Sequence, residues 1–310
     1  MPIAIIVHGG AGTITPDRFE VVQAGCKEAA AIGWRVLQEG GTALDAVEAA
    51  VRALEDNPSF NAGTGACLTT DGNIELDAGM MEGQALRAGA VGCVELIKNP
   101  ISLARKVLGS PHTLLIGKGA QTFAQEQGIS LCTLDDLLTE RQYNRWKDSQ
   151  SASKEEADGE PSYFRREVNT LAAREEKHGT VGAVALDATD VLAAATSTGG
   201  FPNKYPGRVG DSPLVGCGFY ADENAAISCT GHGEDFIRLL IAKRAADFVA
   251  CGISAQDAAE ATITMLGDKA EGTGGLIVVD RLGNVGHAWN SKNMAYAYMT
   301  ESVTEAVAGV

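Results

Sequence analysis

The chain has 310 residues, of which 45% are hydrophobic, so it is long enough to bury the core of one large or two modest globular domains. Its formal net charge of −15 excludes sequence-independent nucleic-acid binding, which needs a basic surface, and argues against docking on anionic membranes. Small anionic substrates remain compatible with this charge, because a single arginine can hold a carboxylate.

Cysteine usage and the first residues indicate the compartment. The seven cysteines are odd in number and show no Cys-x-x-Cys spacing, which favours reduced, buried thiols in a cytoplasmic protein. The apolar run at 1–8 lacks a basic start, so it predicts a strand and not a signal peptide. No apolar run reaches the length of a membrane span.

The first half of the chain predicts strands and paired helices. A strand at Ile3–Val7 leads into a glycine cluster, whose glycines are typical of tight turns or of backbone that approaches something closely. A helix over 19–39 ends at Gly40-Gly41, and Thr42 is typical of the N-cap of a second helix that runs to Glu55. The next predicted elements are a hairpin over Leu68–Leu76, a strand over 88–94, a helix over 100–108 and a short strand over 114–117 followed by a helix.

A polar, charge-dense segment at 147–178 predicts a mobile, solvated linker, and mobility is typical of a cleavage site. After it the pattern predicts strands at Val181–Asp187, Leu192–Ser197 and Ala225–Cys229, helices at Asp235–Val249 and Ser254–Leu266, and a hairpin over 275–280 and 284–289. Short turns between adjacent strands imply antiparallel sheets. Helices on both sides of stacked sheets predict an α/β fold, a four-layer α-β-β-α sandwich.

The junction Gly179-Thr180 is the most informative position. If this bond breaks, Thr180 carries a free α-amine beside its own hydroxyl, which is a nucleophile and a base in one residue. An α-amine titrates near about 7.7–8.0, so it accepts a proton at neutral pH. The alternative interpretation is an ordinary loop exit before a strand.

Further candidate site residues lie next to glycines in the sequence. Thr198 precedes two glycines, and the hydroxyl of Thr230 with the amide of Gly231 can donate to an oxyanion before a helix, although simple helix capping explains them equally well. Arg208 and Asp211 can hold the α-carboxylate and α-amine of an amino acid, and a local surface ion pair is the alternative.

Asn61 follows a helix end, where its amide can donate to a substrate or its loop carbonyls can wrap a monovalent cation, and a plain turn is the alternative. Competing signatures are weak. No Gly-x-Ser-x-Gly occurs, Gly216–Ala221 matches a dinucleotide motif without its helix, and the five histidines lack zinc-site spacing. His232 is compatible with substrate contact or with loop support.

Together these segments resemble the plant-type L-asparaginase / isoaspartyl peptidase family of N-terminal-nucleophile hydrolases. The resemblance runs in the family's order through nearly the whole chain, on the segments Val7–Gly12, Phe60–Gly63, Gly179–Val184, Ala195–Gly200, Gly207–Pro213 and Thr230–Glu234.

The resemblance implies a self-cleaving enzyme that releases L-aspartate from β-aspartyl (isoaspartyl) dipeptides and L-asparagine. Thr180 is then the nucleophile, Thr198 assists it, and Asn61 lies close to it. Substrate is held by Arg208 and Asp211, the oxyanion by Thr230 and Gly231, and Gly233 shapes the pocket.

The same resemblance implies an α-subunit of residues 1–179, with the linker at its end, and a β-subunit of 180–310, which together form one structural domain and assemble as a dimer of αβ units. No cofactor takes part in catalysis. A structural sodium ion is held by carbonyls of Leu54, Glu55, Asn57, Phe60, Ala62 and Thr64. Two alternatives remain: glycosylasparaginase of the same superfamily, and a non-catalytic amino-acid-binding protein.

Overall fold

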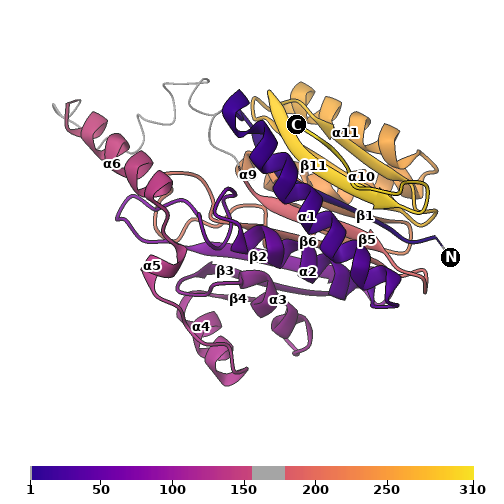
Figure 1. Ribbon diagram of the computed structural model, residues 1–310, viewed down its shortest axis with the longest axis horizontal. Coiled ribbons are helices and arrows are strands. Elements are labelled where there is room, and N and C mark those ends of the chain that lie inside the picture. The colour runs from indigo at the N-terminus through magenta and orange to yellow at the C-terminus, as the bar shows by residue number, and fades with distance from the viewer. Residues whose placement is uncertain (1, 156–178) are drawn as a thin grey trace.

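The structure is a computed structural model that describes residues 2–155 and 179–310. The first sheet contains β1 (Ala4–Gly12), β2 (Leu76–Glu82), β3 (Arg87–Val94), β4 (Leu114–Ile116), β5 (Val181–Leu186), β6 (Leu192–Thr198), β11 (Asn293–Thr300) and β12 (Val307–Gly309). These eight strands follow the order β12-β11-β1-β5-β6-β2-β3-β4. The chain therefore has a mixed α/β fold built on one large sheet (Figure 1).

A second, four-stranded antiparallel sheet has the order β10-β9-β8-β7. Its strands are β7 (Phe219–Ala221), β8 (Ala225–Gly231), β9 (Gly274–Asp280) and β10 (Val285–Trp289). The two strands predicted directly after Thr180 are confirmed as β5 and β6, as is the hairpin of β9 and β10. The C-terminal strands β11 and β12 were not predicted, and β11 pairs with β1, which makes the N-terminal strand an interior one.

The helices are α1 (Phe19–Gln38), α2 (Ala43–Asp56), α3 (Pro100–Leu108), α4 (Gly117–Glu126), α5 (Leu134–Leu137), α6 (Glu140–Glu155), α9 (Gly233–Leu239), α10 (Ile241–Ala250) and α11 (Ala255–Lys269). In the capping box of α2, Thr42 accepts from the Asp45 amide, and the Asp45 carboxylate accepts from Thr42, as predicted. Within the described residues no helix has the length and apolar character needed to cross a bilayer.

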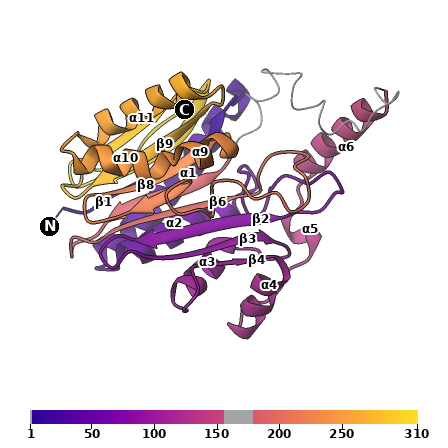
Figure 2. The same ribbon diagram turned by 180° about the vertical axis from the view of Figure 1, so that it is seen from behind.

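Alternating residues of the central strands pack into different cores. Ile5 and Val7 of β1 belong to a buried cluster with α1, α2 and α3, whereas Ala4 and Ile6 belong to a second cluster that includes Phe219 and other residues of the smaller sheet. A third cluster joins β8 and β9 to α10 and α11 (Figure 2). Because β1 is buried on both faces, its first four residues, 4–7, form an unbroken apolar run.

The prediction of purely antiparallel sheets is wrong at one edge. Strand β4 pairs with β3 in parallel, with Ala90 opposite Leu114. Helix α3 lies between the two strands in sequence, so the chain returns to the same end of the sheet before β4 begins. Such a crossover joins parallel neighbours, whereas a tight turn joins antiparallel ones.

The predicted hairpin over Leu68–Leu76 is also wrong. The segment turns, with the Thr69 amide donating to the Asn73 carbonyl, but a strand begins only at Leu76. Asp71 stabilises the turn by accepting from the Thr69 hydroxyl and the Asn73 amide group. The indole of Trp146 donates to the Thr69 carbonyl, so this turn supports α6 and pairs with no second strand.

The helix predicted over Asp235–Val249 is two helices. Leu240 adopts the left-handed conformation, with φ 52°, and separates α9 from α10. The first amides of α10 donate to the carbonyls of Gly216 and Cys217, so the loop before β7 redirects the chain at this point.

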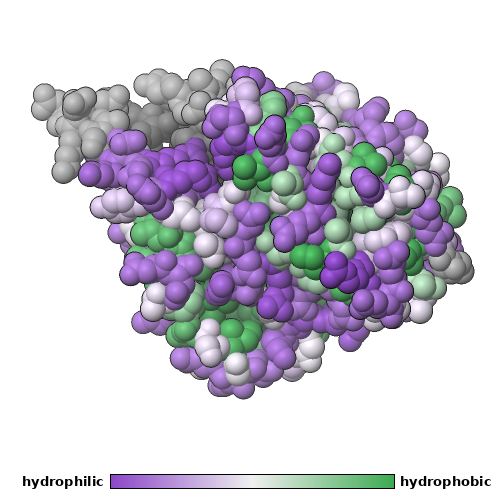
Figure 3. All heavy atoms as spheres, in the orientation of Figure 1, coloured by the Kyte–Doolittle hydropathy of each residue, from purple (hydrophilic) through white to green (hydrophobic). Residues whose placement is uncertain are grey.

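The predicted linker begins too early. Helix α6 extends to Glu155, so residues 147–155 are helical, and the rest of the linker lies outside the described residues. Hydrophilic residues dominate this helix, and on the face seen in Figure 3 hydrophilic and hydrophobic residues are otherwise interspersed.

Candidate active site

Thr180 lies directly before β5, at the end of the large sheet where β6 finishes. Its side chain is buried, and its hydroxyl donates to the hydroxyl oxygen of Thr198, 3.1 Å away. Thr198 also accepts from the Gly200 amide at 3.0 Å. Because Val181 pairs with Ser197, the antiparallel register of β5 and β6 brings the two threonines together. A second hydroxyl oxygen thus orients the Thr180 hydroxyl.

The backbone before Thr180 is tightly enclosed. Gly10, at φ +105°, lies so near that an added Cβ would sit 2.7 Å from the Gly179 Cα. Strand β1 changes register between His8 and Ala11, which forms the bulge that carries Gly10. The predicted close approach of the glycine cluster is therefore confirmed, and its partner is the backbone of the candidate cleavage site.

Asn61 joins the loop after α2 to the loop after β6. Its side-chain amide donates to the Gly200 carbonyl at 2.6 Å, and its side-chain oxygen accepts from the Cys67 amide at 2.8 Å. Its backbone carbonyl accepts from Gly199. A Cβ added at Gly179 would lie 2.8 Å from the Asn61 Cβ. Asn61 is therefore next to the junction, as expected, but its side chain bonds both loops instead of forming a plain turn.

Thr230 and Gly231 form the end of β8 in the smaller sheet. The hydroxyl of Thr230, which is fully buried, accepts from the Ala11 amide at 3.1 Å and so joins β8 to the β1 bulge. The N-cap of the following α9 is His232. Helix capping by Thr230, the alternative interpretation, is therefore wrong.

Arg208 does not pair with Asp211 at the surface, so that alternative is wrong too. The Nε and Nη2 atoms of Arg208 donate to both carboxylate oxygens of Glu234 at 3.0 and 2.9 Å, and its guanidinium lies 4.6 Å from the Phe201 ring centroid. A Cβ added at Gly233 would lie 2.6 Å from Arg208 Nη2 and 3.0 Å from Asp211 Oδ1. Glycine at the start of α9 thus leaves room for both charged side chains beside this turn of the chain.

One carboxylate oxygen of Asp211 is buried without a hydrogen-bond donor among the described residues. The residue is 4% exposed, and the oxygen without a donor is Oδ2. Burial raises the pKa of this carboxyl to about 7, although the positive charge of Arg208 opposes the shift. A buried carboxylate oxygen without a donor is costly, so the site is well suited to a ligand that brings an ammonium group.

Two neighbours of the candidate site residues, Glu234 and His8, were missed by the sequence reasoning. Glu234 was not paired with Arg208 because the two residues are distant in sequence. His8 is fully buried, with Nε2 3.0 Å from the Ser228 hydroxyl, and burial lowers its pKa to about 3, which keeps the imidazole neutral. The only signal for His8 is its place between an apolar strand and a glycine cluster. His232 contacts Asp235 at 2.8 Å, which fits the loop-support interpretation.

The loop after α2 contains the residues that the resemblance assigns to sodium. A Cβ added at Gly65 would lie 2.7 Å from the Pro58 carbonyl oxygen and 2.8 Å from that of Phe60, so carbonyls converge inside this loop. In the described ranges the carbonyls of Phe60 and Ala62 accept no hydrogen bond. Oxygen donors of this kind suit a hard cation, so the residues fit a sodium ion.

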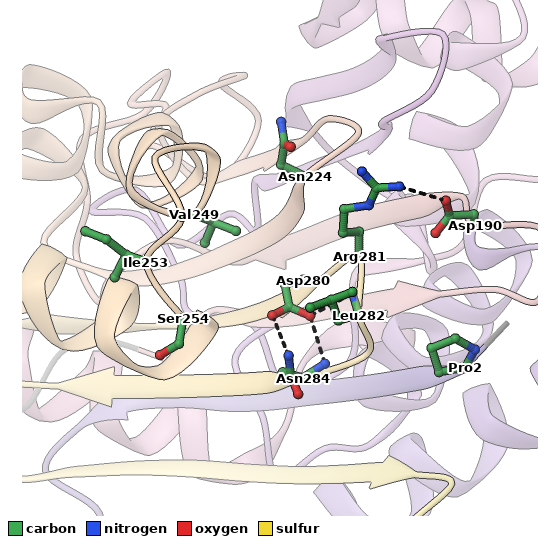
Figure 4. A pocket seen from close by; sticks show the side chains of 11 residues that line it. Pro2, Asp190, Asn224, Val249, Ile253, Ser254, Asp280, Arg281, Leu282 and Asn284 are labelled. Atoms are coloured by element: carbon green, nitrogen blue, oxygen red, sulfur yellow. Dashed lines mark hydrogen bonds and ion pairs between the residues drawn. The ribbon is translucent and has the colours of Figure 1, made fainter.

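A hollow of about 700 Å³ lies elsewhere, near the turn between β9 and β10 (Figure 4). Its polar side chains stabilise local structure. Asp280 accepts from the backbone and side-chain amides of Asn284, and Arg281 pairs with Asp190 at 3.5 Å. It includes none of the candidate site residues.

The fold and site define a mixed α/β protein with a buried threonine directly before a strand, and with a buried carboxyl, Asp211, that is suited to an ammonium group. Comparisons with known proteins agree. The chain matches the asparaginase family over residues 1–308. It is similar to the plant-type L-asparaginase of Thermococcus kodakarensis, with 50% identity over 313 residues that cover 99% of each chain.

It is also similar to the isoaspartyl peptidase/L-asparaginase of Homo sapiens, with 42% identity over 298 residues that cover 96% of this chain and 92% of the relative. The plant-type L-asparaginase of Pyrococcus horikoshii is 48% identical over 313 residues, which cover 99% and 100% of the two chains. The chain belongs to the asparaginase family.

Proposed function

We propose that this protein is a self-cleaving threonine amidohydrolase that releases L-aspartate from β-aspartyl dipeptides and L-asparagine. One observation carries the proposal: the hydroxyl of Thr180 is buried against Thr198 at 3.1 Å, directly after the enclosed backbone of Gly179. The printed names of the relatives, L-asparaginase and isoaspartyl peptidase/L-asparaginase, support the same activity.

Self-cleavage is the first step. The Thr180 hydroxyl attacks the Gly179 carbonyl carbon, the peptide C–N bond breaks, and the Thr180 nitrogen takes up the proton that the hydroxyl loses. Water then hydrolyses the resulting ester, which leaves an α-subunit of residues 1–179 and a β-subunit of 180–310. The freed α-amine, with a pKa of about 7.7–8.0 in an unperturbed chain, becomes the base for later turnovers.

In each turnover Thr180 attacks the β-carbonyl of the substrate, and its own amine accepts the hydroxyl proton and passes it to the leaving amine. Arg208 holds the α-carboxylate and Asp211 the α-ammonium, so the β-carbonyl is the one presented to Thr180. The hydroxyl of Thr230 and the amide of Gly231 stabilise the oxyanion, and water then releases aspartate from the ester.

We also propose how the layers are arranged, how the subunits assemble and where a sodium ion binds. The three buried clusters support a four-layer α-β-β-α sandwich in which both subunits form one structural domain. Assembly as a dimer of αβ units follows the family resemblance. A structural sodium ion is held by backbone carbonyls of Leu54, Glu55, Asn57, Phe60, Ala62 and Thr64, and it supplies rigidity to the loop that carries Asn61.

The proposal also places the protein in the cytoplasm. All seven cysteines lie within the described residues and are free thiols there, and four of them are buried. Free thiols favour a reducing compartment over the oxidising ones in which structural disulfides persist.

Gel electrophoresis and aspartate release test the activity together. Wild-type protein is expected to resolve into two chains on incubation, whereas Thr180→Ala stays full length. Purified wild-type enzyme is expected to release aspartate from L-asparagine and β-Asp-Leu. Release from GlcNAc-Asn alone would assign the chain to glycosylasparaginase, and a persistent single band in wild-type protein would favour a binding protein.

A further inference from the structure

A hollow of about 350 Å³ adjoins the candidate cleavage site. Its lining includes Gly10, Asn61 and Gly179, the residues that enclose the backbone before Thr180. This volume is within the range of small-molecule sites in proteins. Gly179 forms part of the wall, so the hollow reaches the backbone directly before Thr180.

Three arginines also line this hollow, which is unexpected in a chain of net charge −15. Arg18 lies at the start of α1, and Arg141 and Arg145 are four residues apart on α6, so both face the same side of that helix. Arg18 donates to the Ser59 carbonyl, and Arg141 donates to the Pro58 carbonyl at 3.2 Å.

These contacts hold the guanidinium groups without neutralising them. Among the described residues neither Arg18 nor Arg141 forms an ion pair with a carboxylate. Partial burial lowers the pKa of Arg18, and the nearby charge of Arg145 lowers it further, although Asp17 acts in the opposite direction. Partial burial likewise lowers the pKa of Arg141, and the charge of Arg18 lowers it further. The hollow is therefore a concentrated positive site suited to an anion.

We propose that this hollow binds the leaving amino acid of a β-aspartyl dipeptide, and that its arginines hold the free α-carboxylate of that residue. The inference rests on the proposed function and names its leaving-group site. Arg208 and Asp211 hold the aspartyl half of the substrate, on the side of α9. The arginines of the hollow, from α1 and α6, then hold the other half. L-Asparagine, whose leaving group is ammonia, makes no use of them.

A cycle of substrate and enzyme changes tests the proposal. The rate constant kcat/KM is measured for β-Asp-Leu, for β-Asp-Leu-NH2, which lacks the carboxylate, and for L-asparagine. The enzymes are wild type, Arg18→Gln, Arg141→Gln and the charge-conserving Arg141→Lys, each confirmed as cleaved by gel. Arg52→Gln, an exposed arginine on α2, is the matched control. Amidation also alters the basicity of the leaving amine, but every variant shares that effect. A change in the acid-to-amide ratio of kcat/KM between variants therefore reports on the guanidinium group alone.

For wild type, kcat/KM is expected to be about tenfold higher for β-Asp-Leu than for β-Asp-Leu-NH2, which corresponds to the free energy of one charge-assisted hydrogen bond. Arg18→Gln and Arg141→Gln are expected to lower this ratio to near one, while Arg141→Lys and Arg52→Gln retain most of it. If the arginine variants still release aspartate and their acid-to-amide ratio is unchanged, the leaving-group site is overturned and the proposed function is not.

Slower self-cleavage with an unchanged ratio also overturns the leaving-group site, and assigns the arginines to the Gly179 end. If an arginine variant fails to fold or to cleave itself, the wild-type enzyme still tests the site. A wild-type kcat/KM that is about equal for β-Asp-Leu and β-Asp-Leu-NH2 rejects it. Absence of aspartate from all three substrates rejects the proposed function itself.

Discussion

Replacing Asp211 with asparagine tests the electrostatics of the substrate pocket through stability. The carboxyl of Asp211 is 4% exposed and its pKa is raised from 3.8 to about 7, chiefly by burial. The folded protein therefore binds this proton more tightly than the unfolded chain does. As a result, the contribution of this carboxyl to the free energy of unfolding is greatest below pH 4 and is lost as the pH rises from about 4 to about 7.

The magnitude follows from the shift. A difference of about 3 pKa units at about 1.36 kcal/mol each corresponds to about 4 kcal/mol of unfolding free energy, as an upper bound. Asp211→Asn retains the shape and removes the charge. Apart from a constant offset, its unfolding free energy is expected to exceed that of the parent by up to this amount at pH 8, and this pH-dependent excess is expected to vanish toward pH 4.

Urea unfolding between pH 4 and pH 8 measures this difference. Both proteins carry Thr180→Ala, so that each remains a single chain and subunit dissociation does not complicate the transition. The pH-dependent part of the difference is the diagnostic quantity, because the new amide adds a constant offset. A difference that stays constant across this range, or that grows toward acid, would refute the assignment of a buried, uncompensated carboxylate.

Three further predictions concern the site and its frame. Thr198→Val removes the acceptor for the Thr180 hydroxyl and the Gly200 amide, so gels and aspartate assays should show self-cleavage and turnover slowed at least about tenfold, with Thr198→Ser largely intact. Gly10→Ala places a methyl against Gly179 and should slow self-cleavage in a gel time course; processing at the wild-type rate would contradict the packing argument. Leu240→Gly relieves a left-handed residue and should raise the unfolding free energy by about 1 kcal/mol, while Leu239→Gly in α9 lowers it by a similar amount; equal effects would exclude strain at Leu240.

The sequence predicts elements well where local signals suffice. Strands β5 and β6 and the start of α2 were predicted within a residue or two, because an apolar run between turn residues and a Thr-Asp capping box act locally. The hairpin at Leu68–Leu76 failed because strand pairing is decided by distant partners. Leu76 begins a strand that pairs with β3 and β6, and the preceding turn contacts α6 instead.

Contacts between residues distant in sequence also limit what the sequence predicts about the candidate site. The candidate residues come from segments whose motifs are local, and the structure brings Thr180 to Thr198 and places both Arg208 and Asp211 next to Gly233. Glu234, the bidentate partner of Arg208, and Ser228, the partner of His8, are contacts across long sequence separations. Neither has a local pattern that would reveal it, because only the packing of the two sheets determines which side chains meet.

Packing also explains why glycine precedes Thr180. Gly179 lies between Gly10, whose added Cβ would come within 2.7 Å of its Cα, and Asn61, whose Cβ would lie 2.8 Å from a side chain at 179. Asn61 is fixed by three hydrogen bonds, so it cannot easily move aside. A residue with a side chain at 179 would therefore shift the backbone next to Thr180, including the carbonyl that the proposed self-cleavage requires. In the Gly-Thr pair, the proposed chemistry requires the threonine, and the packing requires the glycine.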